Sequence, residues 1–195
     1  GPNVRVRNID FIGATSFDED ALKKQIRTRT WIWIARRGNL DEEILEDDVA
    51  SLREFYRGKG FFDVRVGRRI VFSADQTEAQ VEFLVDEGPR YTVETITFRG
   101  NESIDEAELR QTLRLGEGMP FDRAMIDRDI RRLVDAYAPT GMIYDPTLND
   151  PDFLRISATQ RFRLEPGTLE LIYEITEGRP TVVNSVEVRG NSRTK

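Results

Sequence analysis

The feature that most constrains this chain is a short pattern that occurs three times. It reads apolar-x-x-apolar-x-apolar-x-Gly, and its copies end at Gly13, Gly100 and Gly190. The copies are separated by 87 and then 90 residues. Apolar residues at alternate positions predict a half-buried strand, and the glycine predicts a turn after it. A repeat of this length predicts two small units with one fold and the beginning of a third.

The similarity between the copies continues beyond the first strand. A helix is expected next, with Ser16 and Ser103 as the N-caps. A second, amphipathic helix follows, because apolar residues recur at positions i, i+4, i+7 and i+11. These two stripes are Leu45, Val49, Leu52 and Tyr56 in the first copy and Ile126, Ile130, Leu133 and Tyr137 in the second.

Two further strands complete each copy. Alternating apolar residues predict them within 62–72 and 81–85, and again within 156–164 and 169–175. An acidic residue and a glycine then close each copy, at Glu87-Gly88 and at Glu177-Gly178.

We therefore predict an α+β fold of tandem β-α-α-β-β repeats, each with two helices on one face of a three-stranded mixed sheet. The expected domains are residues 3–89 and residues 90–179. Residues 180–195 are expected to be the truncated start of a third repeat.

Composition excludes several functional classes. The chain has no cysteine and no histidine, which rules out thiol and histidine catalysis and histidine-based zinc sites. Its net charge of −6 argues against binding to nucleic acid. No apolar run is long enough to cross a bilayer. We expect no enzyme activity, no catalytic residue, no metal site and no cofactor.

Two local features have alternative interpretations. The acidic residues within 41–48 could bind a cation, but they are more typical of the start of a helix, where carboxylates favour the positive end of the dipole. The apolar run Trp31, Ile32, Trp33 and Ile34 could be an exposed contact for a partner, a neighbouring domain or a membrane surface. Alternatively, one tryptophan covers the small core and the other covers a seam between domains.

Several stretches resemble the POTRA domains of BamA-like outer-membrane β-barrel assembly proteins. They are the strand that ends in Gly100-Asn101, the end of the second helix at 52–62, and the closing Glu87-Gly88-Pro89. The resemblance covers essentially the whole chain. It implies the fold predicted above and a place at the periplasmic face of the outer membrane. The membrane barrel of such proteins is expected to lie outside this chain.

The resemblance also implies partners and a site. The partners would be unfolded outer-membrane proteins, added to an exposed sheet edge by β-augmentation, and accessory assembly lipoproteins. In the family the exposed edge is the second strand of the unit, which places the site at Val64, Arg65, Val66, Gly67, Arg68, Arg69 and Ile70. The matching stretch of the second copy is 156–164. The alternative is a structural spacer or docking segment of a two-partner-secretion or division protein.

Overall fold

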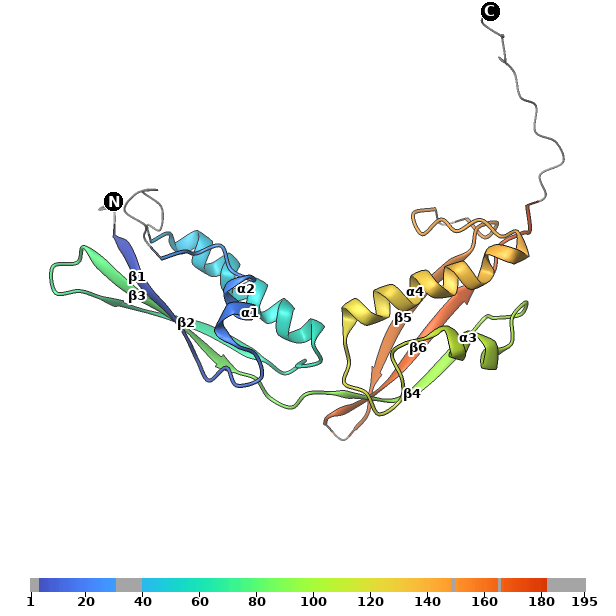
Figure 1. Ribbon diagram of the computed structural model, residues 1–195, viewed down its shortest axis with the longest axis horizontal. Helices are drawn as coiled ribbons and strands as arrows, with labels where there is room; N and C mark the ends of the chain where they lie inside the picture. Colours follow the sequence, from blue (N-terminus) through green and yellow to red (C-terminus); the bar gives the residue numbers. More distant parts are fainter. Residues whose placement is uncertain (1–3, 31–39, 149, 165, 182–195) are drawn as a thin grey trace, which may run out of the picture. The chain divides into compact units, whose positions relative to one another are not determined.

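The computed structural model describes residues 4–30, 40–148, 150–164 and 166–181. Within these residues the chain forms two compact units, the first built mainly from residues up to Glu94 and the second mainly from residues after it. In each unit the helices lie on one face of a three-stranded sheet (Figure 1). The expected start of a third repeat lies almost entirely outside the described residues.

The first unit has the predicted order of elements. They are β1 (Arg5–Ile12), α1 (Glu19–Lys23), α2 (Glu42–Gly58), β2 (Arg65–Phe72) and β3 (Glu78–Asp86). The strand order in the sheet is β1-β3-β2. β1 runs parallel to β3 and β2 runs antiparallel to it, so the last strand of the unit is the central one.

The second unit repeats this arrangement. Its elements are β4 (Thr92–Arg99), α3 (Glu106–Thr112), α4 (Arg123–Tyr137), the short 3-10 helix η1 (Ala138–Thr140), β5 (Arg155–Phe162) and β6 (Thr168–Thr176). Its strand order, β4-β6-β5, is the equivalent one. The predicted α+β fold of two β-α-α-β-β repeats is confirmed.

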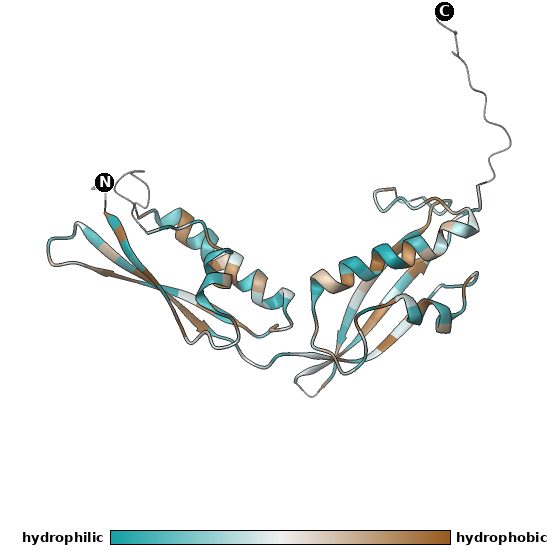
Figure 2. Ribbon diagram, in the orientation of Figure 1, coloured by the Kyte–Doolittle hydropathy of each residue, from teal (hydrophilic) through white to brown (hydrophobic). Residues whose placement is uncertain are grey.

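The core of each unit lies between the long helix and the sheet. The predicted stripe of α2, from Leu45 to Tyr56, is buried against the inward residues of β3. The strands and the long helices α2 and α4 all carry mixed hydrophobic and hydrophilic positions (Figure 2). Phe11 stacks on Phe83 with ring centroids 5.5 Å apart. Phe98 and Tyr173 form the equivalent stack at 5.4 Å in the second unit.

The predicted glycine turn after the first strand is confirmed in both units. Gly13 has a φ of +85° and Gly100 a φ of +81°, a region that side-chain-bearing residues rarely adopt. A Cβ atom on Gly13 would lie 2.2 Å from the carbonyl oxygen of Val85, and one on Gly100 would lie 2.1 Å from that of Ile175. The glycine is therefore required because the turn passes directly against the end of the central strand.

The predicted N-caps are wrong. Asp18, and not Ser16, caps α1, and its side chain accepts a hydrogen bond from the Ala21 amide. In the second unit Asp105, and not Ser103, occupies the N-cap position of α3. The serines are engaged elsewhere, because both donate to the carboxylate that closes their unit.

That carboxylate is Glu87 in the first unit. It accepts hydrogen bonds from the backbone amides of Thr15 and Ser16, both at 2.9 Å or less, and from both hydroxyl groups. Tyr56 on α2 donates a further bond at 3.0 Å. Burial acts to raise the pKa of Glu87, but the bonds from Ser16 and Thr15 together outweigh it and lower this pKa to about 2.

Glu177 closes the second unit in the same way. Its carboxylate accepts from the amides of Glu102 and Ser103, both at 2.8 Å, and from the Ser103 hydroxyl. Tyr137 on α4 donates at 2.8 Å. Burial opposes the shift, yet these hydrogen bonds lower the pKa of Glu177. We call each arrangement, the glutamate with its serine and tyrosine, a closing clamp.

Each long helix also carries a buried aspartate that accepts hydrogen bonds from two backbone amides. Asp48, only 1% exposed, accepts from the amides of Arg27 at 2.6 Å and Thr28 at 2.9 Å. Asp129, fully buried, accepts from the amides of Arg114 at 3.0 Å and Leu115 at 2.9 Å. The acidic stretch at 41–48 does start a helix, with Asp41 as the N-cap of α2. Asp48, however, anchors the segment after the first helix.

Candidate partner-binding surface

The strand β2 is an edge of the first sheet. It pairs with β3 on one side, and no described strand pairs with it on the other. The predicted site residues from Arg65 to Ile70 lie on it. Val64 precedes the strand, and its side chain is buried in the core, so this side chain does not contribute to the edge.

The side chains of β2 alternate between two faces. Arg68 points to the helix face, where its guanidinium bonds Glu46 of α2 at 2.9 Å. Arg69 lies on the open face, where it bonds Glu82 of β3 at 2.6 Å. Val66 and Ile70 therefore share the helix face with Arg68, whereas Arg65 and Gly67 share the open face with Arg69.

The backbone amides of β2 also alternate in direction along the strand. The Ser73 amide donates to the Glu78 carbonyl at 2.9 Å in the hairpin, and Ser73 stands opposite Glu78 in the continuation of the register. In an antiparallel pair, hydrogen-bonded and non-hydrogen-bonded positions alternate. The amides of Gly67 and Arg69 thus point to β3, and those of Val66, Arg68 and Ile70 point outward from the sheet.

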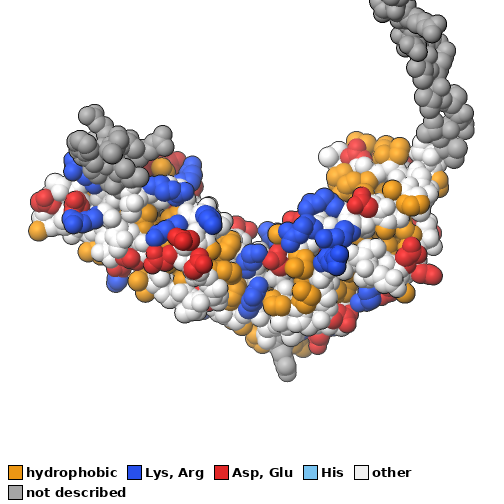
Figure 3. Space-filling model, in the orientation of Figure 1, with side chains coloured by type: hydrophobic (Ala, Val, Ile, Leu, Met, Phe, Trp, Pro, Cys, Tyr) orange, Lys and Arg blue, Asp and Glu red, His pale blue; other side chains and the backbone are white. Residues whose placement is uncertain are grey.

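Charges along the edge are partly balanced. Arg68 and Arg69 have the carboxylate partners described above, while Arg65 has no hydrogen-bond or ion-pair partner among the described residues. Basic and acidic side chains are interspersed over the visible face of this unit (Figure 3). The edge is therefore mildly basic at Arg65 rather than uniformly charged.

Comparison with known proteins gives the fold a family. The family model described as "POTRA: Surface antigen variable number repeat" matches residues 4–88 and 91–178. The chain belongs to the POTRA family. Both units are POTRA repeats, which confirms the family that the sequence resemblance indicated.

The curated relatives are named as outer membrane protein assembly factors. The chain is 22% identical over 200 residues to the outer membrane protein assembly factor BamA of Neisseria meningitidis, which it matches over 100% of its own length and 24% of the relative's. It is 26% identical to a putative outer membrane protein assembly factor of Treponema pallidum, over 100% of the chain and 23% of the relative. The chain thus spans about a quarter of the length of these relatives.

Solved structures support the same fold. Haemophilus influenzae BamA POTRA3-5 superposes with a TM-score of 0.56 at 19% identity, covering 98% of this chain and 73% of that one. BamA from Haemophilus ducreyi lacking POTRA domains 1-3 gives a TM-score of 0.54 at 20% identity, covering 90% of this chain and 29% of that one. Among the described residues, no helix combines the length and the apolar character needed to span a membrane.

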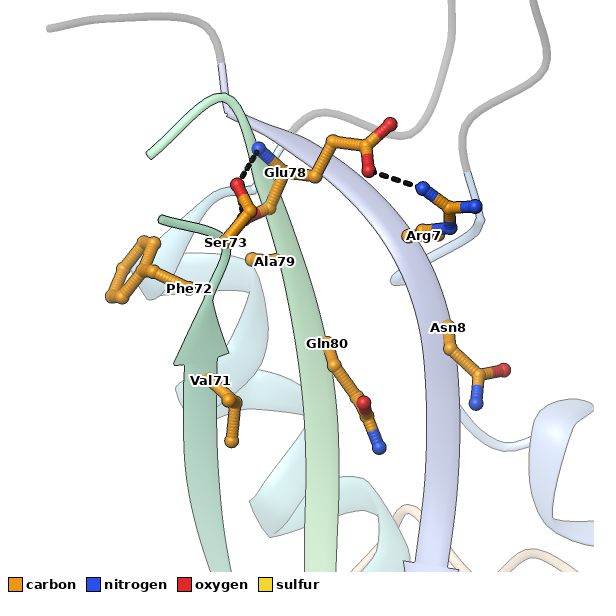
Figure 4. Close-up of a pocket in the computed structure, with 8 residues that line it drawn as sticks. All are labelled: Arg7, Asn8, Val71, Phe72, Ser73, Glu78, Ala79 and Gln80. Atoms are coloured by element: carbon orange, nitrogen blue, oxygen red, sulfur yellow. Dashed lines mark hydrogen bonds and ion pairs between the residues drawn. The ribbon is translucent and has the colours of Figure 1, made fainter. Parts of the chain in front are cut away.

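The open face of the first POTRA repeat is hollowed near the β2–β3 hairpin. Asn8, Gln80 and Val71 project from this face, with the helices behind the sheet (Figure 4). Arg7 bonds Glu78 at 2.6 Å across the rim of the hollow. The Val71 side chain is 46% exposed. Within the hollow, Glu78 is hydrogen-bonded to both Arg7 and Ser73.

The second POTRA repeat offers an equivalent edge. β5 is the edge strand of its sheet, and it covers most of the predicted stretch 156–164. The Arg163 amide donates to the Thr168 carbonyl at 3.3 Å, as Ser73 does in the first repeat. The same alternation directs the amides of Ile156, Ala158 and Gln160 outward.

The remaining predicted contact cannot be placed. Trp31, Ile32, Trp33 and Ile34 lie outside the described residues. Within the described part of the chain, no group of three or more acidic side chains is arranged to hold a metal ion.

Proposed function

We propose that this chain is the periplasmic polypeptide-binding region of an outer-membrane protein assembly factor. In this proposal β2 of the first POTRA repeat receives segments of unfolded β-barrel proteins as an added strand, at the periplasmic face of the outer membrane. Accessory assembly lipoproteins dock on the same region. The assembly-factor names of the curated relatives support this setting.

The observation that carries the proposal is the outward row of amides on β2. Val66, Arg68 and Ile70 present a donor at every second residue, which is the spacing an added strand requires. Recognition through the backbone makes few demands on sequence. That property suits a site that handles many different unfolded chains.

The side chains of the edge fit this use. Natural edge strands carry charged residues that discourage uncontrolled pairing. Arg68 and Arg69 supply such charges, but both are turned aside by their carboxylate partners, Glu46 and Glu82. The backbone of β2 thereby stays accessible to an extended segment.

A structural spacer is the second candidate. It is favoured by the short connection between the two family matches, which end at residue 88 and resume at residue 91. A connection this short limits hinge freedom. A spacer would hold one fixed partner at a set distance and would have no use for a free edge.

Proline substitution separates the two functions. Arg68→Pro removes an outward amide and leaves the bonds to β3 in place, because Gly67 and Arg69 make those bonds. Arg68→Ala is the matched control, since it loses the same ion pairs without the loss of the amide. We expect Arg68→Pro to weaken binding of an amphipathic barrel-strand peptide at least about tenfold, and Arg68→Ala by less than about threefold.

Fluorescence anisotropy gives the affinities, and circular dichroism shows whether each variant is folded. If a folded Arg68→Pro variant bound the peptide as tightly as the parent, strand addition at β2 would be excluded and the spacer function favoured.

A further inference from the structure

Gly67 lies inside the edge strand, where the fold gives it no role. Its φ is not positive, and a Cβ atom built on it meets no atom within 4 Å. Glycine in a strand interior weakens the strand, because it loses more conformational freedom and packs no side chain. Such a glycine is typical of a place where another chain or a ligand approaches closely. Neither backbone geometry nor packing within this repeat accounts for it.

The missing side chain leaves a notch on the open face of the sheet. Gly67 stands opposite Leu84 on β3, and Leu84 stands opposite Ile12 on β1, so the three form one row across the sheet. Leu84 is 36% exposed and Ile12 is 49% exposed. The same three residues line one shallow hollow, with Arg65 at its side. We call this hollow the Gly67 notch.

An added strand would bring one of its side chains directly to this notch. The Gly67 amide points to β3, so a residue paired with Gly67 in an added antiparallel strand occupies a non-hydrogen-bonded position. Side chains are closest at such positions, with Cα atoms about 4.5 Å apart. The incoming side chain would lie on the open face and, meeting no Cβ atom, could lean over Gly67 onto Leu84. Leu84 lies beyond Gly67 in the same row, one strand spacing further on, so only a large side chain, above all an aromatic one, is long enough to lean across the glycine to it.

We propose that the Gly67 notch selects the strand added at β2, by accepting an aromatic or large aliphatic side chain that packs over Gly67 against Leu84. Arg65 favours an acidic residue two positions from that side chain, since it is two residues from Gly67 on the same face and has no described partner. This inference rests on the proposed function, because it supplies the side-chain preference of the same edge.

The second repeat lacks the notch. When the later strands are aligned on Glu87 and Glu177, the positions of Gly67 and Leu84 are taken by Ser157 and Glu174. When the first strands are aligned on Gly13 and Gly100, the position of Ile12 is taken by Arg99. All three are exposed. A polar row of this kind gives an apolar side chain nothing to pack on, so the two edges differ in what they prefer.

The test uses the whole 195-residue chain and two peptides of about ten residues, the length of a barrel strand. Both alternate threonine and valine with one glutamate, and they differ only in a central phenylalanine or alanine two positions from the glutamate. The protein variants are Gly67→Val, which fills the notch with a good strand former, and Ser157→Val as the matched change in the second repeat. Affinity is measured by fluorescence anisotropy and the melting temperature by circular dichroism.

The parent chain is expected to bind the phenylalanine peptide at least about tenfold more tightly than the alanine peptide. Gly67→Val should lose this preference while its melting temperature stays the same or rises. Ser157→Val should keep the preference. A photoreactive benzoyl-phenylalanine in the central position should crosslink to Leu84. In Arg65→Ala, replacing the glutamate of the peptide by glutamine should no longer matter.

Failure of the Gly67 notch and failure of the proposed function would give different results. If Arg68→Pro abolishes binding of both peptides but Gly67→Val still prefers phenylalanine, the notch is overturned and strand addition at β2 stands. If neither peptide responds to Arg68→Pro, the proposed function itself fails, and the notch fails with it.

Discussion

The hydroxyl group of Tyr56 donates a 3.0 Å hydrogen bond to the carboxylate of Glu87, the residue that ends the first repeat. The same carboxylate holds the loop after β1 through Ser16. One charged group therefore ties the end of α2, the first loop and the end of the central strand together. Burial, followed by the bond to Glu87, raises the pKa of Tyr56, so this hydroxyl remains a donor over the whole physiological range.

The clamp predicts how the first repeat responds to acid. The pKa of Glu87 is lowered from its usual 4.5 to about 2, so its stabilising contribution is complete above about pH 5 and is lost as the pH falls toward 2. The carboxylate is partly exposed, so solvent screening reduces its contribution to the free energy of unfolding to about 1–2 kcal/mol. Glu87→Gln should remove this contribution at neutral pH.

Urea unfolding at neutral pH and near pH 3 checks this expectation. The difference in the free energy of unfolding between the parent and Glu87→Gln should shrink on acidification. Asp86→Asn, a change at the exposed neighbouring residue, should leave the pH profile close to that of the parent. Parallel profiles for Glu87→Gln and the parent would contradict the clamp.

Two buried tyrosines of the second repeat provide a matched pair. Tyr137 bonds Glu177 at 2.8 Å, whereas the buried hydroxyl of Tyr173 has no hydrogen-bond partner among the described residues. Tyr137→Phe should lower the free energy of unfolding by about 1–2 kcal/mol, because it deletes a hydrogen bond to a charged group. Tyr173→Phe should be neutral or slightly stabilising. Equal losses in denaturant melts would refute the role of the Tyr137 hydroxyl.

Adjacent aspartates on α2 should behave very differently. Asp48→Ala leaves the amides of Arg27 and Thr28 without their acceptor in a buried place, and should cost about 2–4 kcal/mol. Asp47 forms an exposed ion pair with the Arg27 side chain, so Asp47→Ala should cost less than about 1 kcal/mol. Chemical denaturation of the two variants gives both values, and a larger loss for Asp47→Ala would exclude the anchoring role of Asp48.

Alanine substitutions at two turn glycines should destabilise the protein to different degrees. Gly100 and Gly118 have nearly the same φ, +81° and +83°, but only Gly100 has a carbonyl where a Cβ atom would lie. Gly118→Ala should cost about 1 kcal/mol for the left-handed backbone alone. Gly100→Ala should cost more, because the chain must also move away from Ile175. Melting temperatures of the two variants test the order, and equal losses would mean that the contact with Ile175 does not matter.

The sequence predicted the architecture because the repeat and its apolar stripes report directly on burial. Leu45, Leu52 and Tyr56 recur at helical spacing, and all are buried as expected. Alternation along a strand likewise gave the face of each side chain. It could not give the direction of each backbone amide, which decides how β2 meets a partner. That direction depends on which residue forms the first hairpin bond, here Ser73 with Glu78.

Polar residues were harder to predict than apolar ones. Ser16 precedes a helix and has the chemistry of an N-cap, yet Asp18 competes for that position and Glu87 lies far away in the sequence. Asp48 was hidden in an acidic run, although Asp129 at the matching place in the second stripe was a signal that both acids point inward. Gly67 gave no signal by itself, because its opposite residue, Leu84, is known only from the register.

The central position of β3 and β6 has a consequence for how such chains change over evolutionary time. In each repeat the first and second strands meet only through the strand made last. A repeat that is cut off before this strand loses the partner of both its other strands, and its sheet cannot form. Gains and losses must therefore occur in whole repeats, each carried through to its closing glutamate. That is the pattern expected of a family whose members differ in repeat number.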